Sequence, residues 1–372
     1  MKDIKVFLKY PWIVPDSTFY KNLLKHPPKK VVYINAKNDN FKGVSSTSYF
    51  HYLKYFKRYL KYVINIFKIP NLVKVKPGDF DLIHCAHCLN RSNLPWIVDF
   101  EAFWSFSVSS NISNSYFGRT LIKKYLARDE CKKILAWDET AKKEFEAAIK
   151  DKKILNKLEI LSPGFPMPKY KREKKNNITL LFIARYFYQK GGQVAVKVFD
   201  ELTKKYDNVN AIIVSDTPKE FIKKYASDKI RFHYLMPQEK LYKEIYPKSD
   251  IFVYPGFSDS FGFSMVEAMS FGLPVVTVDG YARKDVVTDG KTGFVVDRTT
   301  GIDYVRLERD PDYYVPEVDL LVNELVKKTS LLIENKTLLT EFRRNAIKEV
   351  DGGRFSLEVR NKKLRKIYLE AL

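Results

Sequence analysis

The sequence predicts an α/β protein built from two Rossmann-like domains. Its 372 residues exceed what one hydrophobic core usually organises, and 45% of them are hydrophobic, enough for two full cores. Short apolar runs of strand length alternate with longer amphipathic runs of helical period along the whole chain. Such alternation predicts parallel sheets covered by helices on both faces.

The first half contains six apolar runs of strand length and one clear helix. The helix is expected over residues 138–149, where charged and apolar positions repeat with helical spacing. The strands are expected at residues 4–8, 31–35, 81–85, 96–100, 133–137 and 158–161.

A break follows at residues 162–177, where three prolines, a glycine and a run of Lys, Arg and Asn interrupt the pattern. This composition is typical of an interdomain linker. We therefore expect an N-terminal domain over residues 1–165, a linker over 166–177, a C-terminal domain over 178–353 and a terminal helix over 354–372.

The second half resumes the alternation. Helices are expected to begin near Gly192, Lys219 and Glu239, and residues 298–319 resemble an inserted loop. Strands are expected at residues 178–184, 211–215, 230–234, 251–254, 275–278 and 293–296. In doubly wound sheets ligands bind beyond the carboxyl ends of the strands, so the loops after these strands carry the candidate site.

Charge and cysteine content narrow the class of protein. Residues 1–175 hold 34 Lys and Arg against 16 Asp and Glu, whereas the remainder holds 31 against 28. This basic N-terminal half suits an anionic partner, although a Lys-rich composition explains it equally well. No nucleic-acid-binding motif accompanies the charge, so no nucleic acid is expected as a partner. Three irregularly spaced cysteines favour a reducing cytoplasm, and no apolar run is long enough to span a membrane.

The most informative segment is residues 254–276. An apolar strand ends at Pro255 and Gly256, a polar loop follows, and helical spacing starts near Phe261. The free N–H groups of a helix start form an anion-binding site, assisted by the helix dipole. Asp259 and Glu267 flank this site, and carboxylates beside a phosphate site usually hold neutral hydroxyls such as those of a sugar or a ribose.

A second motif follows the first strand of the C-terminal domain. Arg185 and Lys190 lie just beyond this strand and precede Gly191 and Gly192, which allow close backbone approach. Arginine offers a planar fork to phosphate oxygens and lysine a point charge, so the pair suits a diphosphate.

Together these segments resemble the donor-site signature of the retaining glycosyltransferases of family 4. That signature is Glu, seven residues, Glu, within a Pro-Ser, Glu-x-Phe-Gly, Glu-Ala-Met-Ala and Gly-x-Pro-Val-Val frame. Here Asp259 replaces the first Glu, Glu267 is the second, and the chain keeps Phe261-Gly262, Gly272 and residues 274–276 of the frame. Ala184 replaces the first Gly of the family's Gly-Arg…Lys-Gly pattern.

The resemblance implies the GT-B fold, in which two Rossmann-like domains face a central cleft and the terminal helix crosses back to the N-terminal domain. It implies transfer of a sugar from a nucleoside-diphosphate sugar to a glycan or lipid-linked acceptor, with retention and without a divalent metal or other cofactor. The implied catalytic residues are Arg185, Lys190 and Asp259, and Glu101 joins them as a catalytic candidate from its own position after a predicted strand. The implied donor-binding residues are Gly191, Ser260, Phe261, Gly262, Phe263 and Glu267.

The N-terminal half departs further from the family. Asp16 and Ser17 stand where many members have a Gly-Gly loop, and we expect them on the acceptor side or as a helix cap. Asp99 and Glu101 stand where many members have a His near the donor sugar. Either acid could bind a sugar hydroxyl or accept the acceptor's proton, and Glu101 is preferred.

Two further segments invite other interpretations. Residues 84–88 hold two His and two Cys, but a structural zinc site needs a second ligand pair that the sequence does not offer, so no metal is expected. Residues 49–68 hold eight aromatics, five cations and no acid, which suits either an anionic membrane surface or an ordinary domain helix with a solvated basic face.

The alternative functions are a GT-B phosphorylase or epimerase, and a degenerate GT-B protein that binds membrane or nucleic acid. The preferred location is cytoplasmic, with possible peripheral attachment to the inner face of the membrane.

Overall fold

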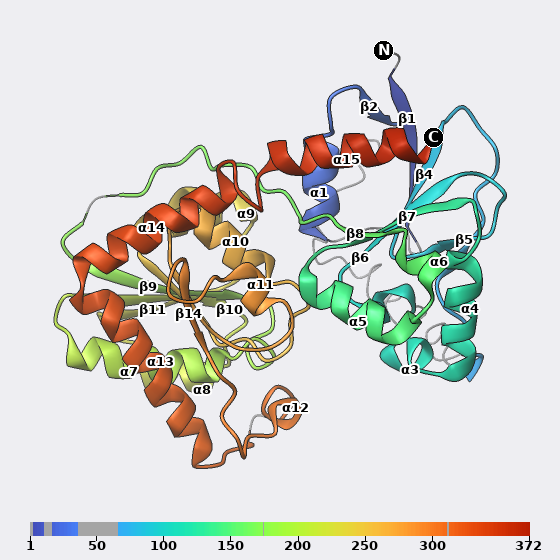
Figure 1. Ribbon diagram of the computed structural model, residues 1–372. Helices are drawn as coiled ribbons and strands as arrows, with labels where there is room; N and C mark the ends of the chain where they lie inside the picture. Colours follow the sequence, from blue (N-terminus) through green and yellow to red (C-terminus); the bar gives the residue numbers. More distant parts are fainter. Residues whose placement is uncertain (1–2, 11–16, 36–65, 174, 311) are drawn as a thin grey trace. The chain divides into compact units, whose positions relative to one another are not determined.

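A computed structural model describes residues 3–10, 17–35, 66–173, 175–310 and 312–372. The chain forms two compact units (Figure 1). Unit 1 comprises Met1–Gly164 and Leu357–Leu372, and unit 2 comprises Phe165–Ser356. None of the described helices combines the length and apolarity that crossing a membrane requires.

Unit 1 is built on a six-stranded parallel sheet with strand order β2-β1-β4-β6-β7-β8. Its strands are β1 (Ile4–Lys9), β2 (Val31–Tyr33), β4 (Leu82–Ala86), β6 (Trp96–Phe100), β7 (Cys131–Ala136) and β8 (Leu158–Ile160). A separate two-stranded parallel sheet pairs β3 (Leu72–Val73) with β5 (Leu89–Asn90). All five residues of β4 and of β6 are buried, as the central strands of a covered parallel sheet should be.

The described helices of unit 1 include the last helix of the chain. They are α1 (Thr18–Lys25), η2 (Phe103–Phe106), α3 (Ser110–Ser113), α4 (Tyr116–Leu126), α5 (Glu139–Ile149), α6 (Lys152–Leu155) and α15 (Leu357–Ala371). The last helix, α15, lies in unit 1 and contacts β7, so the expected return of the C-terminal helix to the N-terminal domain is confirmed (Figure 1).

Unit 2 is a second six-stranded parallel sheet, with strand order β11-β10-β9-β12-β13-β14. Its strands are β9 (Ile178–Ala184), β10 (Val209–Ser215), β11 (Ile230–His233), β12 (Ile251–Tyr254), β13 (Val275–Val278) and β14 (Gly293–Val296). Numbered within the unit, this is the order 3-2-1-4-5-6 of a Rossmann sheet. The predicted pair of doubly wound domains is therefore confirmed.

The helices of unit 2 alternate with these strands. They are α7 (Gly192–Lys205), α8 (Lys219–Tyr225), α9 (Gln238–Lys240), η3 (Leu241–Ile245), η4 (Tyr246–Lys248), α10 (Phe263–Ser270), α11 (Arg283–Val286), α12 (Tyr304–Leu307), α13 (Glu317–Glu334) and α14 (Lys336–Val350). Helix α7 packs against β9 and β10, and α10 packs against β12 and β13.

Three expected boundaries differ in the structure. Helix α10 begins at Phe263, not near Phe261, because Gly262 has a left-handed φ of 85° and ends the preceding loop. The expected loop over residues 298–319 contains α12 and ends at the start of α13. The terminal helix begins at Leu357 because Phe355 N donates to Glu349 O at 2.8 Å, which ties the preceding residues to unit 2.

Candidate functional site

The candidate site of unit 2 lies where its strand order reverses. Strands β9 and β12 are neighbours in the sheet, paired at Leu180 with Ile251, but the chain leaves them toward opposite edges. The loops after these two strands, residues 185–191 and 255–262, therefore face each other at the carboxyl edge. This switch point is where doubly wound sheets bind ligands, and both predicted motifs lie there.

Lys190 joins the two loops. Its Nζ donates to Ser258 O at 2.6 Å and lies 3.2 Å from Asp259 Oδ1, with the two side chains 17% and 19% exposed. The backbone adds a second tie, since Phe257 N donates to Gln189 O at 3.2 Å. The cation and acid predicted from separate motifs thus meet in one place.

The glycine after Lys190 is required by its geometry. Gly191 has a φ of 74° and forms the N-cap of α7, a conformation that glycine adopts without strain. A Cβ on Gly191 would lie 2.9 Å from Pro255 Cβ, so the two loops approach too closely for a side chain.

Asp259 has a second partner that the motif did not predict. Tyr254 OH donates to Asp259 Oδ2 at 2.6 Å, and burial followed by the charge of Asp259 raises the pKa of Tyr254 well above its ordinary value. The tyrosine ring is 2% exposed. Strand β12 therefore fixes the carboxylate that the loop presents.

The N-terminus of α10 is the predicted anion site. The helix starts at Phe263 after Gly262, and a Cβ added at Gly262 would lie 2.3 Å from Met265 Cε. Ser260 is partly exposed in the loop before it, while the ring of Phe261 is buried 5.1 Å from that of Phe263. The loop is thus anchored by Phe261 and leaves the first helical turn beside Ser260.

Glu267 lies on α10 and is 8% exposed. Gln238 Nε2 donates to its Oε1 at 2.6 Å and Tyr246 OH to its Oε2 at 3.2 Å. Sequence reasoning missed both partners, which precede Glu267 by 29 and 21 residues and carry no local signal.

Two further arginines, one on α11 and one in the loop after β14, contact the loop after β12. Arg283 is 1% exposed and donates to the backbone oxygens of Gly256 and Gly280, and burial lowers its pKa. Arg298 donates to Phe257 O at 3.2 Å. Predicted Arg185 is exposed directly after β9. Positive charge therefore borders the carboxyl edge from several elements.

In unit 1 the structure separates the two candidate acids. Asp99 is fully buried, accepting from Tyr20 OH at 2.9 and 2.8 Å and from Trp137 Nε1 at 2.8 Å, with His84 Nε2 at 3.2 Å. Burial alone raises the pKa of Asp99, but the bond and charge of His84 outweigh it and lower that pKa. Asp99 thus lies in the interior of unit 1, and its expected acceptor-side role stays a prediction.

The remaining candidates of unit 1 have simpler outcomes. Glu101 follows β6 and is partly exposed. Ser17 caps α1, because its Oγ accepts from Phe19 N at 3.3 Å. Asp16 and nearly all of residues 49–68 lie outside the described residues. Within the described part of the chain, no three His, Cys, Asp or Glu side chains are grouped to hold a metal.

Part of unit 2 is similar to a known protein family. Residues 167–307 match the family model described as Glycosyl transferases group 1. The match covers less than half of the chain, and it shows that this segment is similar to the group 1 glycosyltransferases. The group 1 segment contains the loops after β9 and β12, and hence both halves of the candidate site.

A curated relative extends the likeness beyond this segment. An uncharacterized glycosyltransferase from Haemophilus influenzae is 29% identical over 237 residues, covering 62% of this chain and 59% of its own length. The chain therefore spans less than two thirds of that relative, and 14% of a sucrose synthase from Denitrovibrio acetiphilus.

Solved structures match the fold. HepE from Anabaena, in complex with UDP and glucose, covers all of both chains with a TM-score of 0.61 and 14% identity. The pneumococcal O-GlcNAc transferase GtfA, in complex with UDP and GlcNAc, covers 84% of this chain and 60% of its own, with a TM-score of 0.56 and 15% identity. The GT-B fold expected from the sequence is confirmed.

Proposed function

We propose that the protein is a retaining, metal-independent glycosyltransferase that moves a sugar from a nucleoside-diphosphate sugar to a glycan or lipid-linked acceptor. The observation that carries the proposal is the meeting of Lys190 with Asp259 at the switch point of a domain similar to the group 1 glycosyltransferases. A diphosphate-binding cation and a hydroxyl-binding acid adjoin there, as a nucleotide sugar requires.

The leaving group sets the electrostatic demand. Departure of a nucleoside diphosphate builds negative charge on its oxygens, and prearranged cations and N–H dipoles stabilise such charge most effectively. Arg185, Lys190 and the first turn of α10 supply them in this proposal. Because these groups carry positive charge or N–H donors themselves, the reaction needs no divalent cation.

Sugar recognition falls to the acids. In the proposal Glu267 holds ribose hydroxyls and Asp259 holds hydroxyls of the donor sugar, while Glu101 of unit 1 accepts the acceptor's proton. The acceptor attacks from the face that the diphosphate leaves, so the anomeric configuration is retained without an enzyme nucleophile. The bound UDP in two solved relatives makes UDP-sugars the first donors to test.

A ligand panel tests the donor assignment. We expect one of the UDP-, GDP- or ADP-sugars to raise the melting temperature, since a ligand that binds only the native state stabilises it. The increase should persist in EDTA. The increase should be lost in Lys190→Ala and kept in Lys197→Ala. Lys197 is a matched control because it lies on α7 and its Nζ is 3.2 Å from the carboxylate of Asp319.

Three results would oppose the proposal. No shift with any nucleotide sugar would favour a degenerate donor site, and a shift abolished by EDTA would refute metal independence. With an acceptor in hand, nuclear magnetic resonance of the product should show the donor's anomeric configuration, and an inverted product would refute retention.

A further inference from the structure

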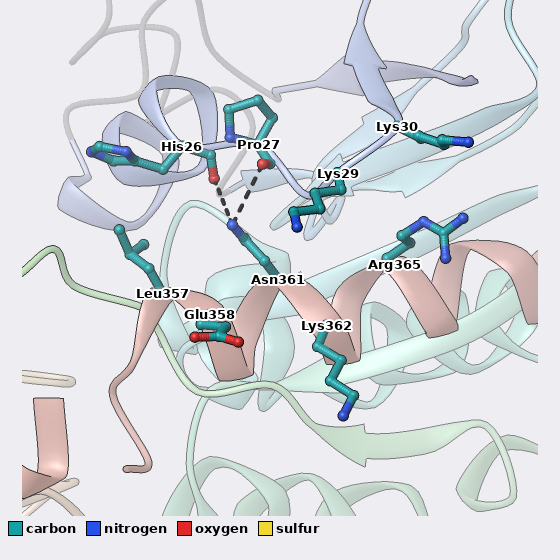
Figure 2. Close-up of a pocket in the computed structure, with 9 residues that line it drawn as sticks. All are labelled: His26, Pro27, Lys29, Lys30, Leu357, Glu358, Asn361, Lys362 and Arg365. Atoms are coloured by element: carbon teal, nitrogen blue, oxygen red, sulfur yellow. Dashed lines mark hydrogen bonds between the residues drawn. The ribbon is translucent and has the colours of Figure 1, made fainter. Parts of the chain in front are cut away.

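A groove on unit 1 has no role in the proposed transfer reaction. A cavity of about 700 Å³ lies between residues 26–30, which precede β2, and the first turns of α15. Figure 2 shows the side chains that line it. It lies by the amino end of β2, whereas Glu101 follows the carboxyl end of β6. Parallel sheets bind their substrates at the carboxyl edge, so this groove is a separate feature.

The rim of the groove is cationic. Lys29 and Lys30 line it from the turn, and Lys362 and Arg365 line it from α15, against the single carboxylate of Glu358 (Figure 2). Asn361 closes its floor, donating to His26 O at 3.1 Å and Pro27 O at 3.4 Å. The two elements are thus held together while their cations surround the opening.

A buried charge on α15, that of Arg360, lies near the groove without lining it. Arg360 is 2% exposed, and its Nη2 donates to Asn22 O at 3.5 Å and to His26 O at 3.1 Å. Among the described residues its Nε and Nη1 have no hydrogen-bond partner, and no carboxylate pairs with it. A buried guanidinium without a counter-charge is costly, and a bound anion would offset that cost. Burial lowers the pKa of Arg360 to about 10, as expected of a cation lacking a partner.

The surroundings of the groove suit an amphiphile more than a free ion. Pro27 and Leu357 add apolar wall, and Val359 and Leu369 of the same helix are each 44% exposed. On the other side of α15 a second cavity of about 910 Å³ shares Lys362 and Arg365. Lysine and arginine in such settings lay their stems on apolar surface and present their charges to an interface.

We propose that this groove binds the phosphate of an anionic lipid headgroup, with α15 lying against the lipid surface. Arg365 offers a fork to the phosphate oxygens, and Lys29, Lys30 and Lys362 add point charges. The site would hold unit 1 at a membrane through residues other than 49–68. A membrane site complements a lipid-linked acceptor and in that respect rests on the proposed function. Vesicle binding can nevertheless be measured without donor or acceptor, so the lipid-binding proposal can fail while the transferase proposal stands.

Vesicle flotation tests the inference. The full chain should float with vesicles of equimolar phosphatidylcholine and phosphatidylglycerol, and not with phosphatidylcholine alone. Each cation near an anionic surface contributes about fivefold to binding, so Lys29→Glu with Lys362→Glu should weaken it by more than about twenty-fivefold. The control Lys223→Glu with Lys224→Glu makes the same charge change on exposed positions of α8 in unit 2 and should bind nearly as the wild type does.

Each remaining outcome is decisive. Absence of binding by the wild type, or equal losses in both double variants, would overturn a lipid site in this groove. A second experiment measures the melting temperature in inorganic phosphate and in chloride at equal ionic strength. If phosphate raises the melting temperature of the wild type but vesicles do not bind, the groove takes free phosphate and the lipid assignment is wrong. Should the Glu pair unfold the protein, Lys29→Gln with Lys362→Gln serves in its place.

Discussion

Removing one hydroxyl should show whether β12 positions the candidate sugar-binding acid. Tyr254→Phe deletes the donor that lies 2.6 Å from Asp259 Oδ2. The ring packing should survive, since the rings of Phe252 and Phe182 lie 5.7 and 6.3 Å from that of Tyr254 and depend on no hydroxyl. The substitution therefore isolates the bond.

The expected loss of activity follows from the charge of the carboxylate that accepts this hydrogen bond. A hydrogen bond to a charged group contributes about 1.5–3 kcal/mol. In the variant Asp259 still has Lys190 Nζ at 3.2 Å from its Oδ1 and is 19% exposed. Water and the lysine therefore compensate for part of the lost hydrogen bond. We expect about 1.5 kcal/mol, or roughly a tenfold fall in kcat/KM. If Asp259 acts mainly in the transition state, kcat should carry most of this fall and KM little.

Initial rates over a range of donor concentrations give both constants. Tyr206→Phe is the matched control, because its hydroxyl also donates to a carboxylate, that of Glu334, on an exposed surface at the end of α7. If Tyr254→Phe retains full kcat/KM, or if the control loses as much, the Tyr254 hydroxyl does not position Asp259.

A second substitution sharpens the test. Asp259→Glu lengthens the acid by one methylene toward the form that the family signature carries, and the Tyr254 hydroxyl then occupies space that the longer chain needs. We expect Asp259→Glu alone to lose activity and the double variant with Tyr254→Phe to recover part of it. Purely additive losses would show that the two side chains are not coupled.

The remaining predictions concern stability. The folded pKa of Asp99 lies below its ordinary value of 3.8, so its carboxylate stabilises the fold above that pH and the contribution disappears as the pH falls through the lowered pKa. Asp99→Asn should therefore cost about 3 kcal/mol of unfolding free energy at pH 7 and progressively less near pH 3, measured by urea denaturation; a pH-independent difference would contradict this. Gly191→Ala should lower the melting temperature more than Gly290→Ala, because both have positive φ but a Cβ meets nothing within 4 Å at Gly290. Equal losses would show that close approach to Pro255 is unimportant.

Much of unit 2 could be predicted from local sequence. The expected strands at residues 178–184, 251–254 and 275–278 coincide with β9, β12 and β13, because fully buried parallel strands are uninterrupted apolar runs that Gly, Pro or charged residues terminate. Since the loops after β9 and β12 hold both motifs, strand prediction also located the candidate site.

The contacts that hold the site could not be predicted in this way. Tyr254 belongs to an apolar strand pattern, and nothing local indicates that its hydroxyl reaches Asp259. Gln238 bonds Glu267 across 29 residues, and Arg283 reaches Gly256 across 27. Such pairs depend on how strands and helices pack, which propensity and periodicity do not report.

In unit 1 the burial of two acids distinguishes them, whereas their spacing in the sequence does not. Asp99 and Glu101 are two residues apart at the end of one strand, so alternation alone predicts the same face for both. The structure buries Asp99 among Tyr20, Trp137 and His84, while Glu101 lies beyond the strand and is partly exposed. The difference arises because β6 ends at Phe100, after which strand alternation no longer applies.

Two of the departures from the family pattern are therefore met by contacts within their own unit. The shorter acid at Asp259 is held by Tyr254 and Lys190, and the acid at Asp99 is balanced by His84. Electrostatic catalysis requires a prearranged charge at the active site. Such a charge lowers the stability of the protein, and a protein without activity gains nothing in return. The alternative of a degenerate donor site gives no reason for a buried tyrosine to hold a partly exposed carboxylate against a lysine. We therefore favour an active transferase over a binding protein that has lost its chemistry.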